Sequence, residues 1–294
     1  MTMQKRVYIV LAVVVVVLAG VAAWQGLRQQ EPVYGGKTLT LWLRTYAPSS
    51  SSRLQSPEWN AADDAVRHMG TNCFPILLRM IRQKDSPSKL WLVAFTRKHG
   101  LTKRIHFVLA AVRNVEASRA FIALGDGAKD AVPALVRMYD ENITVESRSA
   151  IEDALAWIGP AAKPAIPLLV RGTTNANPRV RANALWALGE IHAEPEVCVP
   201  CLIQALNDSD DWARLSAAHA LGMFGTDAKS AVPALTEMTN VSPLLSRGIF
   251  STRLQAMLEA RNALRKIDPP VVWPTSESFL DYGVPAEDAP ISPR

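Results

Sequence analysis

Four segments of the chain repeat one apolar pattern at a nearly constant interval. Each segment has apolar residues at positions i, i+3, i+4 and i+7, which is the spacing of one helical face. The residues that close the four segments are 34, 33 and 33 positions apart: Gly125, Gly159, His192 and Gly225. A repeat of this period, with two helices per unit, predicts a solenoid in which each unit packs only against its neighbours.

The apolar sets predict which residues face the core of each unit. The four regular sets are Ala117, Ala120, Phe121 and Leu124; Ile151, Ala154, Leu155 and Ile158; Ala184, Ala187, Leu188 and Ile191; and Ala217, Ala220, Leu221 and Phe224. Two further sets with the same spacing stand before Gly70 and before Asp268. Alanine lets neighbouring helices approach closely, and the larger residue of each set fills the remaining space. We therefore expect six units, of which the outer two are irregular.

Glycine and proline mark the expected helix boundaries within a unit. Gly125, Gly159 and Gly225 are expected to end the first helix, because glycine adopts the left-handed C-terminal conformation at little steric cost. A proline follows each closing residue eight positions later, and proline is well tolerated only in the first turn of a helix. These prolines predict the starts of the second helices: Pro133, Pro167, Pro200 and Pro233.

An 18-residue run without a charge lies near the N-terminus. Residues 7–24 read VYIVLAVVVVVLAGVAAW and follow a short segment that contains Lys5 and Arg6. A helix of this length spans about 27 Å, close to the ~30 Å hydrocarbon core of a bilayer. The run predicts a transmembrane helix with its N-terminus cytoplasmic and the repeats extracytoplasmic. A cleaved signal peptide is the alternative, because small residues near the end of the run permit cleavage; the mature protein would then be secreted or periplasmic.

The composition divides the chain into four parts. Residues 1–30 form the anchor or signal sequence, residues 31–56 a linker with a short capping helix, residues 57–268 the repeat array, and residues 269–294 a proline-rich acidic tail. The capping helix is expected near Leu39, because an open solenoid end needs a cover over its apolar face. The tail is expected to be extended or disordered, since its prolines prevent a regular helix.

Residues 79–114 interrupt the repeat pattern and concentrate positive charge, with nine cations against Asp85 alone. Trp91, Phe95 and Phe107 lie among these cations, and cations beside aromatic rings bind phosphate groups or anionic head groups. The segment is therefore the candidate binding site; the alternative is a solvated helix whose aromatic residues belong to the core. The candidate binding residues are Arg79, Arg82, Lys84, Lys89, Arg97, Lys98, Lys103 and Arg104.

Three arginines repeat with the period of the units. Each lies eleven residues before a closing residue, and an Asn or Asp lies six positions upstream of it. Polar groups at a fixed offset predict a ladder of hydrogen bonds that ties the inter-unit loops to the helix starts. An arginine stripe that binds anionic ligands is the alternative. The residues of this structural ladder are Arg148, Arg181, Arg214, Asn142, Asn175 and Asp208.

No pattern in the sequence indicates catalysis. The five histidines form no metal-binding motif, and no nucleophile elbow or phosphate-binding loop is present. Cys198 and Cys201 form a CxxC motif, but no further zinc ligands stand at suitable spacing. Because the two cysteines fall at apolar positions of the repeat, we expect them to pack as small apolar residues. Catalytic, metal-binding and cofactor-binding residues are not expected, and neither is a cofactor.

Two units carry a family resemblance. Residues 181–208 (RANALWALGEIHAEPEVCVPCLIQALND) and residues 214–238 (RLSAAHALGMFGTDAKSAVPALTEM) resemble HEAT repeats, notably the bacterial group related to the HEAT-like repeats of phycobilin lyases. The resemblance covers about residues 57–268. It implies an all-α fold, a right-handed α-solenoid of about six HEAT-like helical pairs, here preceded by the transmembrane helix.

The resemblance also implies a function. HEAT arrays mostly serve as binding surfaces, so we expect a membrane-anchored scaffold for protein–protein interaction without catalytic activity of its own. A tetrapyrrole-binding lyase or lyase chaperone is the alternative, and binding of an anionic polymer or lipid head groups by the basic insertion is a third. The expected partners are a protein with an acidic segment and, through residues 7–24, a membrane; nucleic acid and small molecules are not expected.

Overall fold

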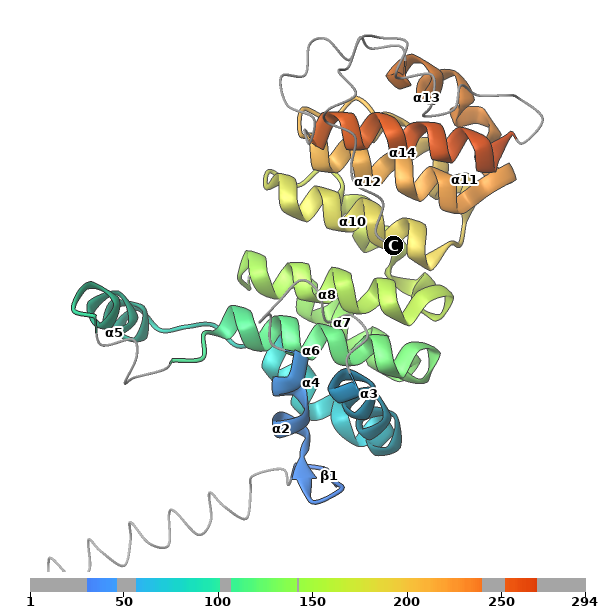
Figure 1. The fold of residues 1–294 in the computed structure, drawn as a ribbon. Helices are drawn as coiled ribbons and strands as arrows, with labels where there is room; N and C mark the ends of the chain where they lie inside the picture. The colour runs from blue at the N-terminus through green and yellow to red at the C-terminus, as the bar shows by residue number, and fades with distance from the viewer. Residues whose placement is uncertain (1–30, 47–56, 101–106, 142, 240–251, 269–294) are drawn as a thin grey trace, which may run out of the picture.

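Two layers of helices alternate along the chain in the computed structural model, which describes residues 31–46, 57–100, 107–141, 143–239 and 252–268. The first layer consists of α3 (Pro57–Met69), α6 (Ala110–Leu124), α8 (Val145–Ile158), α10 (Pro178–Ile191), α12 (Asp211–Phe224) and α14 (Thr252–Ile267). The second layer consists of α4 (Phe74–Ile81), α7 (Val132–Asp140), α9 (Ile166–Gly172), α11 (Pro195–Ala205) and α13 (Val232–Thr239). Figure 1 shows the first-layer helices from α6 to α14 lying side by side.

This arrangement confirms the predicted solenoid-like stack of helical pairs. Within the described ranges five pairs are complete, and α14 stands as the first helix of a sixth unit. Short 3₁₀ helices join the two layers: η2 (Gly70–Cys73), η4 (Gly125–Ala131), η5 (Gly159–Ala165) and η6 (Gly225–Ala231). The right-handed sense of the superhelix stays a prediction.

The first helices end at the predicted closing residues, and each closing residue has a positive φ. Gly125, Gly159 and Gly225 have φ values of 47°, 71° and 52°. His192 takes the place of glycine in the remaining unit and adopts the left-handed conformation, with φ 47° and ψ 50°. A positive φ at a residue other than glycine is uncommon but tolerated by histidine. The three glycines have ψ values of −133°, −142° and −129°, so the four units share the sign of φ but not the whole turn geometry.

Small residues bring the first-layer helices close together. The alanines of the repeated sets are buried, including Ala184, Ala187, Ala217 and Ala220. At Gly189 a Cβ atom would lie only 2.7 Å from Cα of Ala220 on the next helix. Such an approach leaves no room for a side chain, so α10 and α12 pack nearly backbone to backbone. The stack is therefore built from tight contacts between consecutive units.

The prediction for Pro200 is wrong. The other three prolines lie in the first turn of α7, α9 and α13, whereas α11 begins at Pro195 and contains Pro200 in its interior. His192 and Glu194 both have positive φ values in this unit, 47° and 51°. The chain therefore reverses within a few residues, without the 3₁₀ segment of the other units, and Pro195 starts the helix earlier.

The N-terminal part of the described chain differs from a purely α-helical fold. β1 (Val33–Tyr34) and β2 (Lys37–Thr38) form a small antiparallel hairpin where a linker was expected, since Gly35 and Gly36 permit a tight turn. The expected capping helix is α2 (Leu39–Leu43), continued by the 3₁₀ helix η1 (Arg44–Tyr46). Leu39, Leu43 and Tyr46 are buried, and the Tyr46 hydroxyl donates to Asp63 Oδ1 on α3 at 2.5 Å. The segment thus packs against the first unit.

Several predictions lie outside the described residues. These concern the transmembrane or signal run 7–24, the tail 269–294, and the side chains of Lys103, Arg104 and Asn142. Within the part of the chain that the structure describes, no helix is both long enough and apolar enough to cross a membrane.

Candidate functional site

Helix α5 (Pro87–Lys98) lies away from the paired helices, to the side of the stack (Figure 1). We call residues 82–100 and 107–109 the α5 arm. The helix begins where Ser86 Oγ accepts a hydrogen bond from the Lys89 backbone N–H at 3.2 Å, which is the usual role of an N-cap serine. The flanking residues 79–81 belong to α4 and residues 110–114 to α6, so the interruption of the repeat is shorter than 79–114.

Asp85 joins the arm to the stack. Its carboxylate accepts hydrogen bonds from Lys89 Nζ at 2.5 Å and from the Ala110 backbone N–H, at the start of α6, at 2.9 Å. Burial opposes the charged carboxylate, but these two hydrogen bonds and the Lys89 charge outweigh it and lower the pKa of Asp85. Lys89 Nζ also donates to the Val108 carbonyl oxygen at 2.7 Å. These bonds hold the base of the arm, which is where the chain enters α5 at Asp85 and returns from it at Val108.

Large apolar side chains on α5 face outward. Leu90, Trp91, Leu92 and Phe95 are 50%, 66%, 39% and 40% exposed. Trp91 stacks on Phe95 with ring centroids 5.5 Å apart, and Phe95 lies 4.3 Å from the ring of His99. These rings therefore form a row along the surface of the helix. The alternative in which the aromatic residues belong to the core does not describe Trp91 and Phe95.

The eight candidate cations of the basic insertion separate into groups. Arg82 is paired with Glu141 at 2.6 Å, and Lys89 with Asp85. Arg79 is exposed on α4, and Lys84 is exposed before α5. Arg97 and Lys98 are exposed in the last turn of α5, next to the aromatic row, and form no ion pair with described residues. Lys103 and Arg104 lie outside the described residues. Among the described residues, the positive charge next to the aromatic row thus comes from Arg97 and Lys98.

The ladder residues lie in a row where the inter-unit loops meet the first-layer helices. Arg181 Nη1 donates to the backbone carbonyl of Asn175 at 3.0 Å, six residues upstream, and Arg214 Nη1 donates to that of Asp208 at 2.6 Å. Arg181 also forms a two-pronged contact with the Asp208 carboxylate, Nε to Oδ2 at 2.8 Å and Nη2 to Oδ1 at 2.6 Å. The structure therefore joins Arg181 to its own loop and to the loop of the following unit.

The pKa values of this pair agree with its geometry. The hydrogen bond from Arg181 is the largest influence on Asp208 and lowers its pKa, while the same bond raises the pKa of Arg181. Two parallel bonds between guanidinium and carboxylate are among the stronger polar contacts in proteins. This contact was not anticipated, because its two residues are 27 positions apart and in different units.

Arg148 differs from the other two arginines of the row. Its guanidinium lies over the ring of Tyr139 at 5.0 Å, and its Nε is buried without a hydrogen-bond partner. The Tyr139 hydroxyl donates to Oε1 of the fully buried Glu152 at 2.7 Å. Sequence spacing carried no signal for Tyr139 and Glu152, since the pairing depends on how α7 packs on α8.

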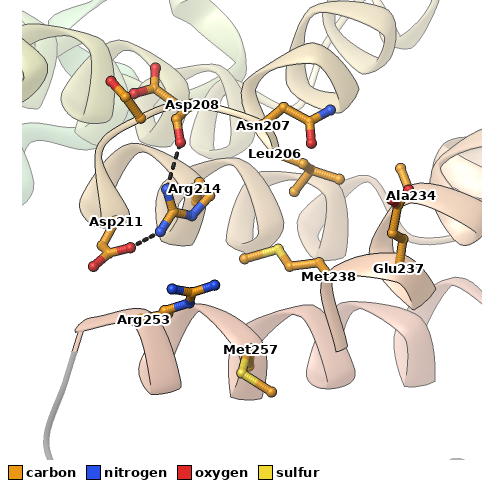
Figure 2. Close-up of a pocket in the computed structure, with 11 residues that line it drawn as sticks. Leu206, Asn207, Asp208, Asp211, Arg214, Ala234, Glu237, Met238, Arg253 and Met257 are labelled. Carbon is orange, nitrogen blue, oxygen red and sulfur yellow. Dashed lines mark hydrogen bonds and ion pairs between the residues drawn. The ribbon is translucent and has the colours of Figure 1, made fainter. Parts of the chain in front are cut away.

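A pocket lies at the third arginine, between α12, α13 and α14 (Figure 2). It has a volume of about 570 Å³. Arg214 contacts Asp211 on its own helix, and Arg253 from α14 also faces the pocket (Figure 2). Burial and the charge of Arg253 lower the pKa of Arg214. Asp208, Asp211 and Glu237 line the same pocket as Arg214 and Arg253, so the pocket contains both signs of charge. Its charges therefore favour no single class of ligand.

The two cysteines of the CxxC motif lie on α11 as free thiols. Cys198 is buried and donates to the Ala193 carbonyl oxygen at 3.3 Å, and burial raises the pKa of its thiol to about 12. Cys201 is half-buried, with its sulfur 3.3 Å from Thr173 Oγ1. A thiol with a raised pKa is a poor nucleophile and a poor metal ligand, which agrees with packing as the role of Cys198.

His219 connects three first-layer helices. Its Nδ1 lies 3.0 Å from Glu259 Oε1 on α14, and its Nε2 lies 3.7 Å from Glu190 Oε1 on α10. The hydrogen bond to Glu259 is the largest influence on the pKa of His219 and raises it, while the same bond lowers the pKa of Glu259. No pattern in the sequence links these residues, since each comes from a different unit.

Comparison with known proteins supports the repeat architecture. A family model described as HEAT repeats matches residues 166–245, which include α9 to α13. The match covers less than half of the chain. No curated protein matches the sequence.

Two solved structures show a limited similarity to this chain. The crystal structure of an engineered protein is 19% identical, with a TM-score of 0.41, over 79% of this chain and 96% of that one. The complex of CpcE and CpcF of phycocyanin lyase from Nostoc sp. PCC7120 is 20% identical, with a TM-score of 0.30, over 79% of this chain and 98% of that one. At these TM-scores neither structure bears on the activity of this protein.

Proposed function

We propose that this protein is an interaction scaffold of HEAT-repeat type and that the α5 arm is its main docking element. The partner segment would combine apolar side chains with acidic ones. The observation that carries the proposal is the exposed row of Leu90, Trp91, Leu92 and Phe95 beside the exposed cations Arg97 and Lys98.

The energetic argument starts from the apolar side chains. Exposed aromatic residues that lie together are uncommon on a soluble surface and mark contact sites. Tryptophan and arginine contribute strongly at protein interfaces, because they bury a large area once water is excluded. Arg97 and Lys98 would add selectivity for acidic residues and a faster association, since exposed charges mainly steer encounter. Together these features favour a mixed apolar and acidic partner over a purely anionic polymer.

A pull-down from cells with matched variants tests this proposal. We expect partners of the full-length wild-type chain to be lost when Trp91 and Phe95 are both changed to alanine, and also when Arg97, Lys98, Lys103 and Arg104 are changed to glutamate. Trp212→Ala is the control, because Trp212 is 56% exposed on α12, away from the arm. If all variants retain the same partners, the arm is not the docking element.

Anionic lipid is the competing ligand for the arm. Sedimentation with vesicles that contain phosphatidylserine, at low and at physiological salt, separates the two cases. Binding that needs the four cations but not Trp91 and Phe95, and that disappears at physiological salt, would favour lipid head groups over a protein partner. The tetrapyrrole-binding alternative has its own test, a visible absorption band after incubation with a bilin.

We further propose that residues 7–24 anchor the chain in a membrane, with the repeats on the extracytoplasmic side. The support is the uncharged 18-residue run that follows a basic segment. Carbonate extraction of a membrane fraction distinguishes the anchor, which would stay in the pellet, from a cleaved signal peptide, which would leave the mature protein in the supernatant.

A further inference from the structure

The α5 arm exposes apolar area and positive charge on one helix. Trp91 and Phe95 are exposed, and Arg97 and Lys98 follow in the last turn of the same helix. Asp85 is the one acidic residue of the arm, and it is bonded at the base. A segment that fits the helix therefore presents large apolar side chains together with carboxylates, because charges across an interface are complementary.

One segment of the chain has this composition and lies outside the repeat pattern. Residues 277–282 read ESFLDY and combine two acidic residues with three large apolar or aromatic ones. We call them the tail segment. They belong to residues 269–294, which contain four acidic residues and one basic residue and lie outside the described part of the chain. The tail segment thus matches the exposed rings and cations of α5 in both hydrophobicity and charge.

The chain leaves α14 at the corner of the first layer that is diagonally opposite the arm. Gly189 on α10 approaches Ala220 on α12, and Gly222 on α12 approaches Ala263 on α14. The 3₁₀ helices η4 and η5, which follow α6 and α8, also contact each other. The first-layer helices therefore run parallel, with their C-terminal ends together. The arm joins the layer at the other end, where Ala110 begins α6.

The distance between these corners keeps the tail segment from the arm of its own copy. Four steps of about 8–10 Å separate α6 from α14, and the 15 residues of α6 add about 22 Å along the helix axis. The corners thus lie roughly 40 Å apart, and α5 lies beyond the first of them, to the side of the stack (Figure 1). The eleven residues from Pro269 to Phe279 span at most about 36–40 Å when fully extended.

We propose that the α5 arm binds the tail segment of a second copy of this chain. The inference rests on the proposed docking function of the arm and names its partner. The carboxylates of the tail segment face Arg97 and Lys98, and its apolar side chains cover Trp91 and Phe95, which removes apolar surface from water. Direct contact between two arms is disfavoured, because both carry net positive charge.

Mixing two variants of the full-length chain tests this contact. The arm variant carries Trp91→Ala and Phe95→Ala, and the tail variant carries Phe279→Ala, Leu280→Ala and Tyr282→Ala. Self-association of each variant alone, measured by sedimentation velocity in one mild detergent, should be weaker than that of the wild type by roughly tenfold or more, as for aromatic anchors of an interface. An equimolar mixture should associate again, because the intact arm of the tail variant binds the intact tail segment of the arm variant.

A charge exchange tests the polar half of the contact. Arg97→Glu with Lys98→Glu should weaken self-association several-fold, because like charges then meet. Glu277→Lys with Asp281→Lys should do the same. The chain that carries all four substitutions should recover most of the wild-type association.

The matched control reverses the two acidic residues of the tail that lie outside the tail segment. Glu287→Lys with Asp288→Lys makes the same change in net charge as the reversal of Glu277 and Asp281, and it should have little effect. An equal loss in both pairs would report net charge and would contradict the contact. So would a chain with all four exchanged charges that stays as weak as either pair.

The mixing experiment can also overturn the contact. A wild-type chain without self-association would do so, as would a tail variant that associates like the wild type or a mixture that stays as weak as its components. The pull-down with the arm variant then decides the proposed function separately. If that variant loses its cellular partners, the arm docks another protein; if it keeps both its partners and its self-association, both proposals fail.

Discussion

The stack from α10 to α14 and the α5 arm differ in where their side chains find partners. In the stack, alanines and Gly189 close the space between helices, and Asp208 and His219 bind residues of neighbouring units. In the arm, Trp91 and Phe95 are exposed, and within the described ranges the hydrogen bonds to the rest of the molecule lie at its base. In a repeat array, each helix buries its apolar face and pairs its polar groups against the neighbouring units. An inserted helix without a partner unit leaves its apolar surface in water.

This difference assigns separate roles to the two regions. The contacts of the stack account for stability, because each unit buries its apolar set against the next. The apolar surface of the arm contributes little to stability and is available to another molecule. Substitutions of the same kind in both regions therefore test the comparison directly.

The largest effect is expected from matched phenylalanines. Phe121→Ala, at a fully buried position, should lower the free energy of unfolding by about 3–5 kcal/mol, since it removes apolar contacts and leaves a cavity. Phe95→Ala in the arm should change it by less than about 0.5 kcal/mol, as for most surface substitutions. Urea unfolding monitored by circular dichroism measures both. A loss of more than about 2 kcal/mol for Phe95→Ala would contradict the outward orientation of the aromatic row.

The next largest effect is a difference in stability loss between variants of two aspartates that are nearly equally buried. The side chains of Asp208 and Asp85 are 12% and 11% exposed. Asp208→Ala should cost about 2 kcal/mol, because it leaves Arg181 without its two charge-assisted hydrogen bonds. Asp85→Ala should leave the unfolding midpoint nearly unchanged but speed the amide hydrogen exchange of residues 87–98, because it releases the arm and not the stack. Equal losses of global stability in both variants would mean that the arm unfolds together with the stack.

The smallest effect is a pH dependence confined to the stack. The raised pKa of His219 means that its pairing with Glu259 stabilises the fold fully below the unfolded histidine pKa of about 6.5, and that this contribution is lost as pH rises through the folded value. The lowered pKa of Glu259 removes the contribution again as pH falls below its ordinary 4.5. Unfolding temperatures measured across this range should fall at the alkaline end. The His219→Gln variant should lack that fall, and a persistent fall in the variant would assign it to another group.

Much of the fold could be predicted from local sequence. The positions of Gly125, Gly159 and Gly225 and the apolar spacing before them located the first helices, because both depend on residues within one or two turns. The error at Pro200 has the same origin. The rule that proline opens a helix is local, and it overlooked Pro195, which meets the rule five residues earlier.

The candidate site was predicted only in part. The period exposed residues 79–114 as an interruption with concentrated charge, but the sequence pattern did not show that Arg82 and Lys89 are paired or that Trp91 faces water. An aromatic residue among apolar neighbours fits a core helix and an exposed arm equally well. The choice depends on whether another helix packs against it.

By itself the sequence determined the period of the units, the ends of most helices and the apolar face of each, because these follow from backbone preferences and helical spacing over short distances. The tertiary structure decided which groups meet across units. It placed Asp208 on Arg181 and Asn175 opposite Arg148, and it brought Glu190 and Glu259 to His219. Those contacts join residues that are 27 to 40 positions apart, so they depend on how consecutive helices stack and not on any local pattern.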